Sequence, residues 1–305
     1  MSGAPRARLW LAYACLAASM AIVGSYVALS KTLILIFPLF VLAGLRFGIA
    51  AVAMAGWVKR GAAEPALDAR ARGLLFAESF FGNFLFSICM LGGMALTSAL
   101  AAGVIMAAMP AIVALLSWWW LGERIAPRVA AGIACAVGGI AMVSLSRQAE
   151  AQAGVPLSQA LLGNLLLVGA VTCEAIYVVV GKKLAAKVSA KRISALINLW
   201  GLALIAPFGL WQALSFDFQA VGGSAWTLLV FYSLAASMFT VWLWMTGLRQ
   251  VPASQAGVFT VMLPVSTAAV GVLFLGEQFS GVQAAAYSLA LAGVVLATWP
   301  GPRTT

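Results

Sequence analysis

The chain lacks histidine, paired metal ligands and a phosphate-binding glycine loop, and each absence excludes a class of function. Histidine, the commonest general base and metal ligand, is absent from all 305 residues. The four cysteines, Cys15, Cys89, Cys135 and Cys173, lie inside apolar stretches without metal-ligand spacing, so we expect them to pack as small residues. We therefore expect neither an enzyme nor an ATP-driven pump, and no catalytic residue, metal or cofactor.

Charged residues are also scarce, and this scarcity indicates a membrane protein. They make up 9% of the chain, whereas hydrophobic residues make up 64%; soluble domains have about 25% and about 45–50%. Charge-free stretches of about 20 residues, enough to cross a bilayer as helix, recur along the whole sequence. The stretches are continuously apolar rather than alternating, which excludes a β-barrel pattern. The sequence predicts an all-α polytopic membrane protein.

Charge-free runs bounded by polar residues divide the chain into ten predicted transmembrane helices. No soluble domain fits between them, and the first run lacks a small-residue cleavage site, so no cleavable signal is expected. The predicted spans lie near residues 8–30, 36–58, 72–95, 98–121, 127–146, 159–181, 192–213, 224–248, 252–275 and 280–299.

The positive charges in the connecting loops predict the orientation. Of the 18 Lys and Arg residues, fifteen fall on one side of the predicted spans, two (Lys31 and Arg147) on the other, and Arg46 within a span. The excess marks the cytoplasmic side, so both termini are predicted to be cytoplasmic. The net charge of +10 is thereby explained by the membrane, and no nucleic acid partner is expected. The fifteen are Arg6, Arg8, Lys59, Arg60, Arg70, Arg72, Arg124, Arg128, Lys182, Lys183, Lys187, Lys191, Arg192, Arg249 and Arg303.

One sequence pattern occurs twice. A shift of 154 residues superimposes a glycine, a proline and a glutamate of each half: Gly103, Pro110 and Glu123 fall on Gly257, Pro264 and Glu277. A proline within an apolar helix removes a backbone hydrogen bond and kinks the helix. We therefore predict that Pro110, Pro264, Gly103 and Gly257 form the hinge of a transporter.

The repeat extends over the whole chain. With nearly the same shift, Tyr26 and Lys31 of the first span match Tyr177 and Lys182 of the sixth. The predicted domains are thus residues 1–150 and 151–305, with five spans each. Because five is odd, the second half must enter the membrane from the opposite side, which gives an inverted repeat of the kind found in many secondary carriers.

These residues resemble a known family. Val23-Gly24-Ser25-Tyr26 with Lys31, then Leu45-Arg46-Phe47, and the run from Pro110 to Leu121-Gly122-Glu123-Arg124 with its second copy look like the EamA branch of the drug/metabolite transporter superfamily. The resemblance implies ten helices in two inverted halves and export of small metabolites. It is strongest toward bacterial exporters of aromatic amino acids. This chain departs from the family pattern in having Val23 instead of a frequent tryptophan and Glu174 instead of a frequent aromatic residue.

Three charged residues lie inside the predicted spans: Arg46, Glu78 and Glu174. A charge at this depth costs about 2.5–3.5 kcal/mol on insertion scales, so it normally faces the bundle interior with a partner. In one interpretation Arg46 attracts a substrate carboxylate, while Glu78 or Glu174 takes an ammonium group or a proton. In the other, Arg46 forms a structural ion pair with one glutamate. We favour the second for Arg46, because arginine there belongs to the general family pattern, and keep all three as candidates.

Polar and aromatic residues at mid-depth complete the predicted substrate site. Trp200 is the side chain best suited to stack on a planar ligand. The alternative for the hydroxyl and amide groups is hydrogen bonding to a neighbouring helix, which is common in membranes. The candidates besides the three charged residues are Ser79, Asn83, Asn198, Trp200, Tyr26 and Tyr177.

Glu123 and Glu277 occupy equivalent helix ends on opposite membrane faces. We expect each carboxylate to accept hydrogen bonds from the amides that open the following helix, where the helix dipole favours negative charge.

The sequence thus predicts a secondary transporter in the bacterial inner membrane that exports small metabolites, including aromatic amino acids, by alternating access. Its expected partners are a small-molecule substrate and the lipid bilayer. The first alternative is a carrier for nucleotide-sugars or phosphorylated metabolites. Such ligands favour clustered cations within the membrane, and Arg46 is the single deep cation in this sequence. The second alternative is a channel. The oligomeric state stays open between a monomer and a dimer through the stripe from Gly132 to Gly139.

Overall fold

The structure is a computed structural model of the whole chain. It describes residues 3–60, 66–109, 111–112, 115–116, 119, 127–151, 157–184, 188–248, 259, 262–278 and 280–298. The described elements are all helices. The core of a bilayer contains no water that could hydrogen-bond the backbone N–H and C=O groups of an apolar segment. Each such segment therefore forms a helix, in which these groups bond one another.

The first half contains five helical segments, of which the third is continuous through a change of helix type. The second segment ends in a short 3-10 turn, η1 (Ala55–Val58). In chain order the segments are α1 (Gly3–Ile36), α2 (Leu39–Ala53), α3 (Ala69–Ser79) continuing through η2 (Phe80–Leu85) into α4 (Phe86–Leu96), α5 (Ala99–Met106) and α7 (Pro127–Ala151).

The second half repeats this plan. Its third segment is likewise continuous through a change of helix type. The segments are α8 (Leu157–Leu184), α9 (Ala190–Ala213), α10 (Gly223–Leu234) continuing through η3 (Ala235–Phe239) into α11 (Thr240–Leu248), α13 (Met262–Leu275) and α14 (Gly281–Thr298). The described helices therefore fall into ten segments, as the sequence predicts, although α1 runs six residues past the expected end at residue 30.

Several described helices are long and apolar enough to cross a bilayer. Five of the described helical stretches have both the length and the apolar character for it, beginning at Leu9, Ala69, Ser158, Ala190 and Gly223. Four further apolar stretches span 10–17 residues within the part of the chain whose side chains the structure describes: Leu39–Ala53, Pro127–Met142, Met262–Leu275 and Gly281–Leu296.

Local sequence signals explain several helix ends. Pro38 lies between α1 and α2, where a residue without an N–H can precede the first turn of a helix. Asp68 caps α3 by accepting a hydrogen bond from the Ala71 amide at 2.6 Å, and Ser98 caps α5 through the Ala101 amide at 3.1 Å. α14 begins with a reciprocal pair in which Ser280 and Gln283 each bond the other's backbone amide.

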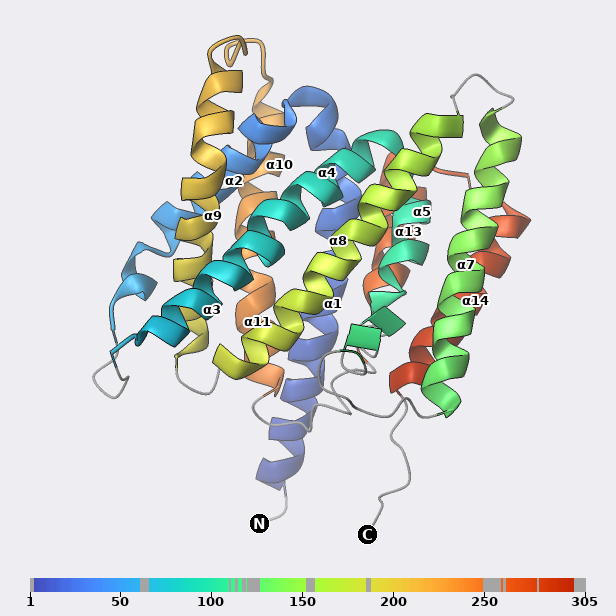
Figure 1. Cartoon of the computed structure of the whole chain (residues 1–305), viewed down its shortest axis with the longest axis horizontal. Helices are drawn as coiled ribbons and strands as arrows, with labels where there is room; N and C mark the ends of the chain where they lie inside the picture. The colour runs from blue at the N-terminus through green and yellow to red at the C-terminus, as the bar shows by residue number, and fades with distance from the viewer. Residues whose placement is uncertain are drawn as a thin grey trace.

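The direction of the helices shows the inverted repeat. α1 runs from the end of the bundle that carries the N-terminus to the opposite end, whereas α8, the first helix of the second half, runs the other way (Figure 1). α1 begins and α14 ends at the same end of the bundle (Figure 1). The fold is thus an all-helical bundle with two oppositely oriented sets of five segments.

The two halves are packed against each other along most of their length. α1 packs on α11 and α13, α2 on α9, α4 on α8, α5 on α13, and α7 on α14. The main core cluster includes Leu42 and Phe86 from the first half together with Leu167 and Leu229 from the second. The interior between the halves is therefore where side chains of both repeats meet.

The third segment of each half contains one turn of π-helix at the same repeat position. η2 covers Phe80–Leu85 and η3 covers Ala235–Phe239, and the shift of 154 residues places the first on residues 234–239. π-Turns are rare and frequently occur at functional sites. The repeat therefore extends from the sequence pattern to a local distortion of the backbone.

Candidate functional site

Arg46 lies near the middle of α2 and is buried between the halves, with 4% of its surface exposed. Its Nη2 donates to Ser87 Oγ of α4 at 3.0 Å. The guanidinium carbon lies 4.2 Å from the ring centroid of Phe47 and 5.9 Å from that of Tyr232 on α10. Aromatic faces attract a cation at these distances, so the two rings stabilise the charge of the guanidinium. The Nε atom of Arg46 has no hydrogen-bond partner.

The structural ion pair expected for Arg46 is not found. The salt bridge present in the described part of the chain joins Lys31 to Glu277 instead. Glu174 on α8 still acts on Arg46 electrostatically. Arg46 and Glu174 are therefore close enough to interact electrostatically, although no ion pair joins them in the described part of the chain.

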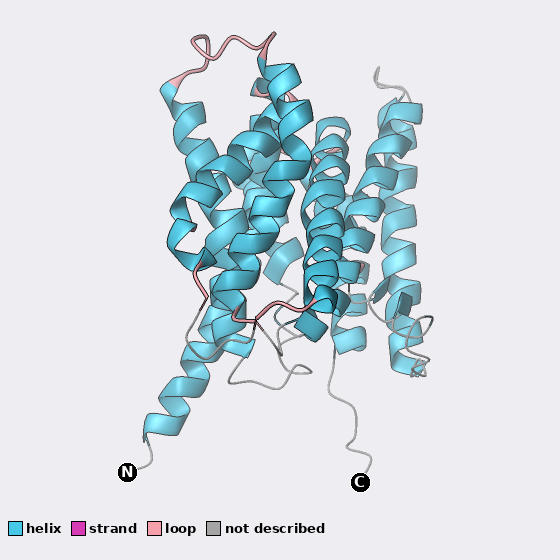
Figure 2. Cartoon of the chain, turned by 60° about the vertical axis from the view of Figure 1, so that its left-hand side comes forward, coloured by secondary structure: helices cyan, strands magenta, loops and turns pink. Residues whose placement is uncertain are grey.

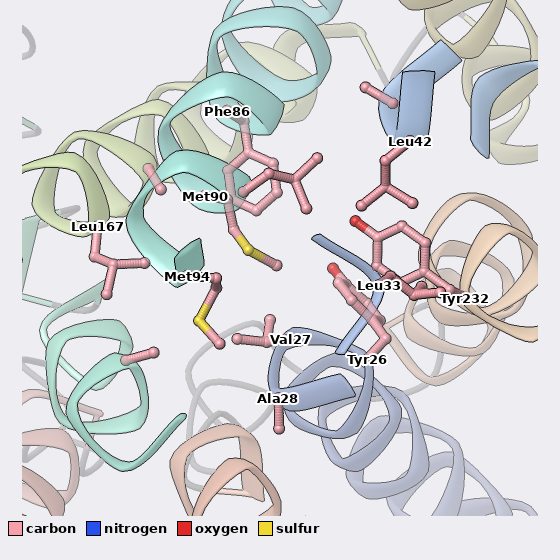
Figure 3. Packing of buried hydrophobic residues seen from close by; sticks show 14 of the residues in the cluster. Tyr26, Val27, Ala28, Leu33, Leu42, Phe86, Met90, Met94, Leu167 and Tyr232 are labelled. Carbon is pink, nitrogen blue, oxygen red and sulfur yellow. The ribbon is translucent and has the colours of Figure 1, made fainter. Parts of the chain in front are cut away.

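Two tyrosines stand beside this pair, one from each half. Tyr26 on α1 and Tyr232 on α10 pack edge to face with ring centroids 5.8 Å apart. Figure 3 shows their hydroxyl groups close together and pointing toward the middle of the core cluster. Tyr26 lies within the electrostatic reach of both Glu174 and Arg46. The structure thus brings together Tyr26, Arg46 and Glu174, three of the residues that the sequence offers as candidates.

Tyr232 is a residue of this cluster that sequence reasoning missed. A signal was available, because the shift of 154 residues places Tyr232 on Glu78, which is itself a candidate. A tyrosine in an apolar span attracts little notice, since its hydroxyl can simply bond a neighbouring helix.

Tyr177 on α8 is packed tightly against the π-turn of the first half. A Cβ atom on Gly82 would overlap Cδ2 of Tyr177 and would lie 2.9 Å from its Cγ. Glu78, Glu174 and Tyr26 all act on the Tyr177 hydroxyl electrostatically. The Tyr177 hydroxyl is therefore within electrostatic reach of both glutamates.

Ser79, Asn83 and Asn198 form hydrogen bonds between helices. Ser79 Oγ and Asn83 Nδ2 both donate to the Ile197 carbonyl on α9, each at 2.8 Å. Asn198 Nδ2 donates to the Phe47 carbonyl on α2 at 2.9 Å, while its buried Oδ1 has no partner. These contacts agree with the alternative stated for the polar candidates, that they hydrogen-bond a neighbouring helix instead of substrate. They join α9 to α2, to α3 and to the π-turn η2.

Trp200 lies apart from the cluster. Its side chain is 46% exposed on α9, and its ring packs edge-on against Phe76 of α3 with centroids 5.5 Å apart. An exposed indole at the edge of a helical bundle suits contact with lipid. The structure therefore does not place Trp200 beside Arg46 and Tyr26.

The predicted hinge is described only in part. Pro110 and Gly257 lie outside the described residues. Gly103 is in the middle of α5, where a Cβ atom would overlap the Tyr287 hydroxyl and lie 3.4 Å from the Pro264 carbonyl. Pro264 is the third described residue of α13. Two hinge candidates from opposite halves are thus in close contact, and bending at them stays a prediction.

Glu277 corrects one expectation from the sequence. It caps α5 rather than the following helix: its Oε1 accepts from the Ala99 amide at 2.7 Å and its Oε2 from the Leu100 amide at 2.8 Å. Lys31 Nζ lies 3.0 Å from Oε1. The chain turns back here because Gly276 adopts φ of 66° and the Glu277 amide bonds the Gly271 carbonyl. α14 has its own cap from Ser280, which leaves this carboxylate free for the other half. Glu123 lies outside the described residues.

The comparisons with known proteins agree with this architecture. The EamA-like transporter family matches residues 10–145 and again residues 161–299. The "Uncharacterized transporter YetK" of Bacillus subtilis (strain 168) is 35% identical over 286 residues, which cover 93% of this chain and 85% of that protein. An "Uncharacterized transporter" of Archaeoglobus fulgidus is 25% identical over 224 residues, which cover 73% of this chain and 76% of that protein.

A crystal structure of a protein with 20% sequence identity shares the fold. Its TM-score is 0.61, and the match covers 92% of this chain and 94% of the other. The two stretches matched by the family and the inverted helical halves lead to one conclusion: the chain is a multi-pass membrane protein that belongs to the EamA-like transporter family.

Proposed function

We propose that this transporter exports zwitterionic amino acids, aromatic ones among them, and that Arg46 binds their carboxylate. The observation that carries the proposal is a buried guanidinium between the halves with an unpartnered Nε and no salt bridge among the described residues. Buried cations are normally paired. A carrier can leave such a charge for its substrate to neutralise.

The surroundings of Arg46 suit an amino acid. Glu174 comes from the other half and acts electrostatically on the same region, so it is the partner for the substrate ammonium group. Phe47 and Tyr232 offer ring faces to the guanidinium, and Tyr26 packs edge to face on Tyr232. Aromatic ligands pack favourably on such rings. A substrate that bridges Arg46 and Glu174 would contact both repeats at once.

Contact with both repeats fits alternating access. Inverted-repeat carriers bind substrate near the midplane, and the halves rock around it. Gly103 and Pro264, which touch across the repeats, are the described positions where this motion is proposed to occur. The charge asymmetry of the loops supports a location in the bacterial inner membrane with both termini in the cytoplasm. Small-molecule substrate and lipid are its proposed partners.

The test uses purified protein reconstituted in liposomes. Saturable counterflow of labelled phenylalanine is expected, and it should be absent from empty liposomes. Arg46→Lys keeps the charge but loses the planar fork, whereas Arg46→Gln removes the charge. Because a hydrogen bond to a charged group contributes about 1.5–3 kcal/mol, the glutamine variant should bind phenylalanine about tenfold more weakly or worse.

Competition separates the substrate classes. Unlabelled tyrosine and leucine should inhibit counterflow, and a sugar phosphate should not. Absence of uptake of every amino acid tested, or inhibition by the sugar phosphate alone, would reject the amino acid assignment. Unchanged affinity in Arg46→Gln would reject the role of Arg46.

A further inference from the structure

Two cysteines, one from each half, meet where α4 packs against α8. These helices lie side by side (Figure 1). A Cβ atom on Gly169 of α8 would lie 3.3 Å from Sγ of Cys89 on α4. Cys173 lies one turn further along α8 and therefore on the same face as Gly169. In agreement with this placement, the thiols of Cys89 and Cys173 share a hydrogen bond.

Close contacts between the two helices lie on both sides of this cysteine pair. One turn further along α4, a Cβ atom on Gly93 would lie 3.1 Å from the Gly163 carbonyl of α8. In the other direction, Gly82 of η2 lies directly against the ring of Tyr177. Small residues let two membrane helices approach closely. A disulfide requires Cα atoms about 4.4–6.8 Å apart, and close contacts on both sides of the pair favour such a separation.

The two thiols of the pair differ in their exposure. Cys173 is buried, whereas Cys89 is half-buried. An accessible cysteine beside a second, resolving cysteine is the arrangement of many redox-sensitive proteins. The other two cysteines come from other helices, Cys15 from α1 and Cys135 from α7, and they are half-buried like Cys89. They therefore serve as matched controls.

The apolar surroundings of the pair favour a neutral product of oxidation. Cys173 belongs to the main core cluster, and Cys89 packs against it. Repeated oxidation of a single thiol gives sulfinic and sulfonic acids, which are ionised at neutral pH and therefore unfavourable in an apolar core. A disulfide carries no charge. The neighbouring thiol of Cys173 thus directs the oxidation of Cys89 toward a disulfide.

We propose that Cys89 and Cys173 are a redox-sensitive dithiol that hydrogen peroxide converts to a disulfide between the two halves. The Cys89 sulfur attacks one peroxide oxygen, the O–O bond breaks, and the thiol proton leaves with the other oxygen as water. The resulting sulfenic acid is attacked by the Cys173 sulfur. The S–S bond forms, the S–O bond breaks, and the hydroxyl group leaves as a second water with the Cys173 proton. The dithiol loses two electrons, and the peroxide is reduced to two water molecules.

The disulfide would join the third segment of the first half to the first segment of the second half. A carrier whose halves rock around the substrate requires such segments to move relative to each other. Oxidation should therefore arrest transport, and reduction should restore it. This consequence rests on the proposed alternating access, whereas formation of the disulfide does not.

The first experiment measures the disulfide itself in wild-type protein in lipid. After treatment with hydrogen peroxide, the protein is unfolded in detergent and its free thiols are alkylated. Because the chain has four cysteines, alkylation should fall from four sites to two, and dithiothreitol should restore all four. Mass spectrometry of a peptic digest should identify a peptide that links Cys89 to Cys173.

Two variants show whether the pair is specific. Cys89→Ser should lose the cross-link, whereas Cys15→Ser should form it as wild type does. Four free thiols in wild type after peroxide treatment, or a cross-link that involves Cys15 or Cys135 instead, would overturn the proposal.

The second experiment follows counterflow of labelled phenylalanine in liposomes. Peroxide should stop counterflow by wild type and by Cys15→Ser, and dithiothreitol should restore it. Cys89→Ser should keep its rate through the same treatment. Unchanged counterflow in wild type whose disulfide has formed would overturn the arrest. Wild type that forms the disulfide but exchanges no amino acid before oxidation would reject the proposed function alone.

Discussion

At the scale of single residues, the closest contacts between the halves depend on glycine. Gly24 of α1 lies against α13, where a Cβ atom would overlap the Leu263 carbonyl and Ser266 Oγ and would lie 2.8 Å from Thr267 Oγ1. Thr267 Oγ1 also donates to the Gly24 carbonyl at 3.1 Å. The close approach involves a backbone carbonyl, so the neighbour cannot turn aside as a flexible side chain could.

Gly24→Ala should therefore destabilise the protein. Overpacking of a close contact costs about 1–3 kcal/mol, and the loss should appear as a lower thermal unfolding midpoint in detergent. Gly48→Ala is the matched control, because Gly48 lies in a transmembrane helix and a methyl group added there would have nothing within 4 Å. Alanine there should be neutral or stabilising by about 0.5–1 kcal/mol. Equal unfolding midpoints for the two variants would contradict the contact.

At the scale of elements, Glu277 joins α1, α5 and the loop after α13 at one end of the bundle. Its carboxylate belongs to the second half, while Lys31, Ala99 and Leu100 belong to the first. The Lys31 side chain is 30% exposed and that of Glu277 only 10%, so water screens this ion pair incompletely. Opening this end during transport must break these contacts or move all three elements together.

Glu277→Ala should expose the first turn of α5. Hydrogen bonds to a charged acceptor contribute about 1.5–3 kcal/mol, so the Ala99 and Leu100 amides should exchange hydrogen about tenfold faster or more. Hydrogen exchange followed by mass spectrometry on a peptide containing both residues measures this. Lys31→Met should have a smaller effect, because the cap remains.

Gln283→Ala is the control for this experiment. Gln283 bonds the Ser280 amide at the start of α14, so its loss should leave α5 protected. Faster exchange of α5 in Gln283→Ala, or no change in Glu277→Ala, would show that the carboxylate does not hold the helix.

At the scale of the whole molecule, the inverted repeat determines which loops lie on which side. The loop between α9 and α10 includes the exposed Gln219, whose amide bonds Asp217. It lies at the end of the bundle opposite the start of α1 (Figure 2). The loop after α2 includes the exposed Arg60, which belongs to the positively charged side.

Cysteine labelling tests this orientation. In a variant without the four native cysteines, Gln219→Cys should react with a membrane-impermeant maleimide in intact cells, because the loop charges predict that its side faces outward. Arg60→Cys should react only after permeabilisation, because positively charged loops remain in the cytoplasm. The reverse pattern would show the opposite orientation, and reaction of both in intact cells would contradict a sealed bundle.

The sequence by itself determined the class of the protein. Apolar length predicts helices because a bilayer offers no alternative partner for backbone groups, and an odd number of spans per half requires inversion. The ten segments and the inverted repeat are confirmed. The division into domains at residue 150, the substrate site and the hinge stay predictions.

Only the tertiary structure decided which side chains meet. Glu277 caps α5 and bonds the Leu100 amide, which lies 177 positions earlier in the sequence. It reaches α5 because Gly276 turns the chain toward the other half. Trp200 and Asn198 are two positions apart in sequence but point to exposed and buried surroundings. Tyr232 lies against Arg46, and the signal for it in the sequence was its match to Glu78 in the repeat. Helical periodicity in a continuously apolar segment does not distinguish an inward from a lipid-facing position, because both surroundings favour the same residues. The facing helices supply that distinction.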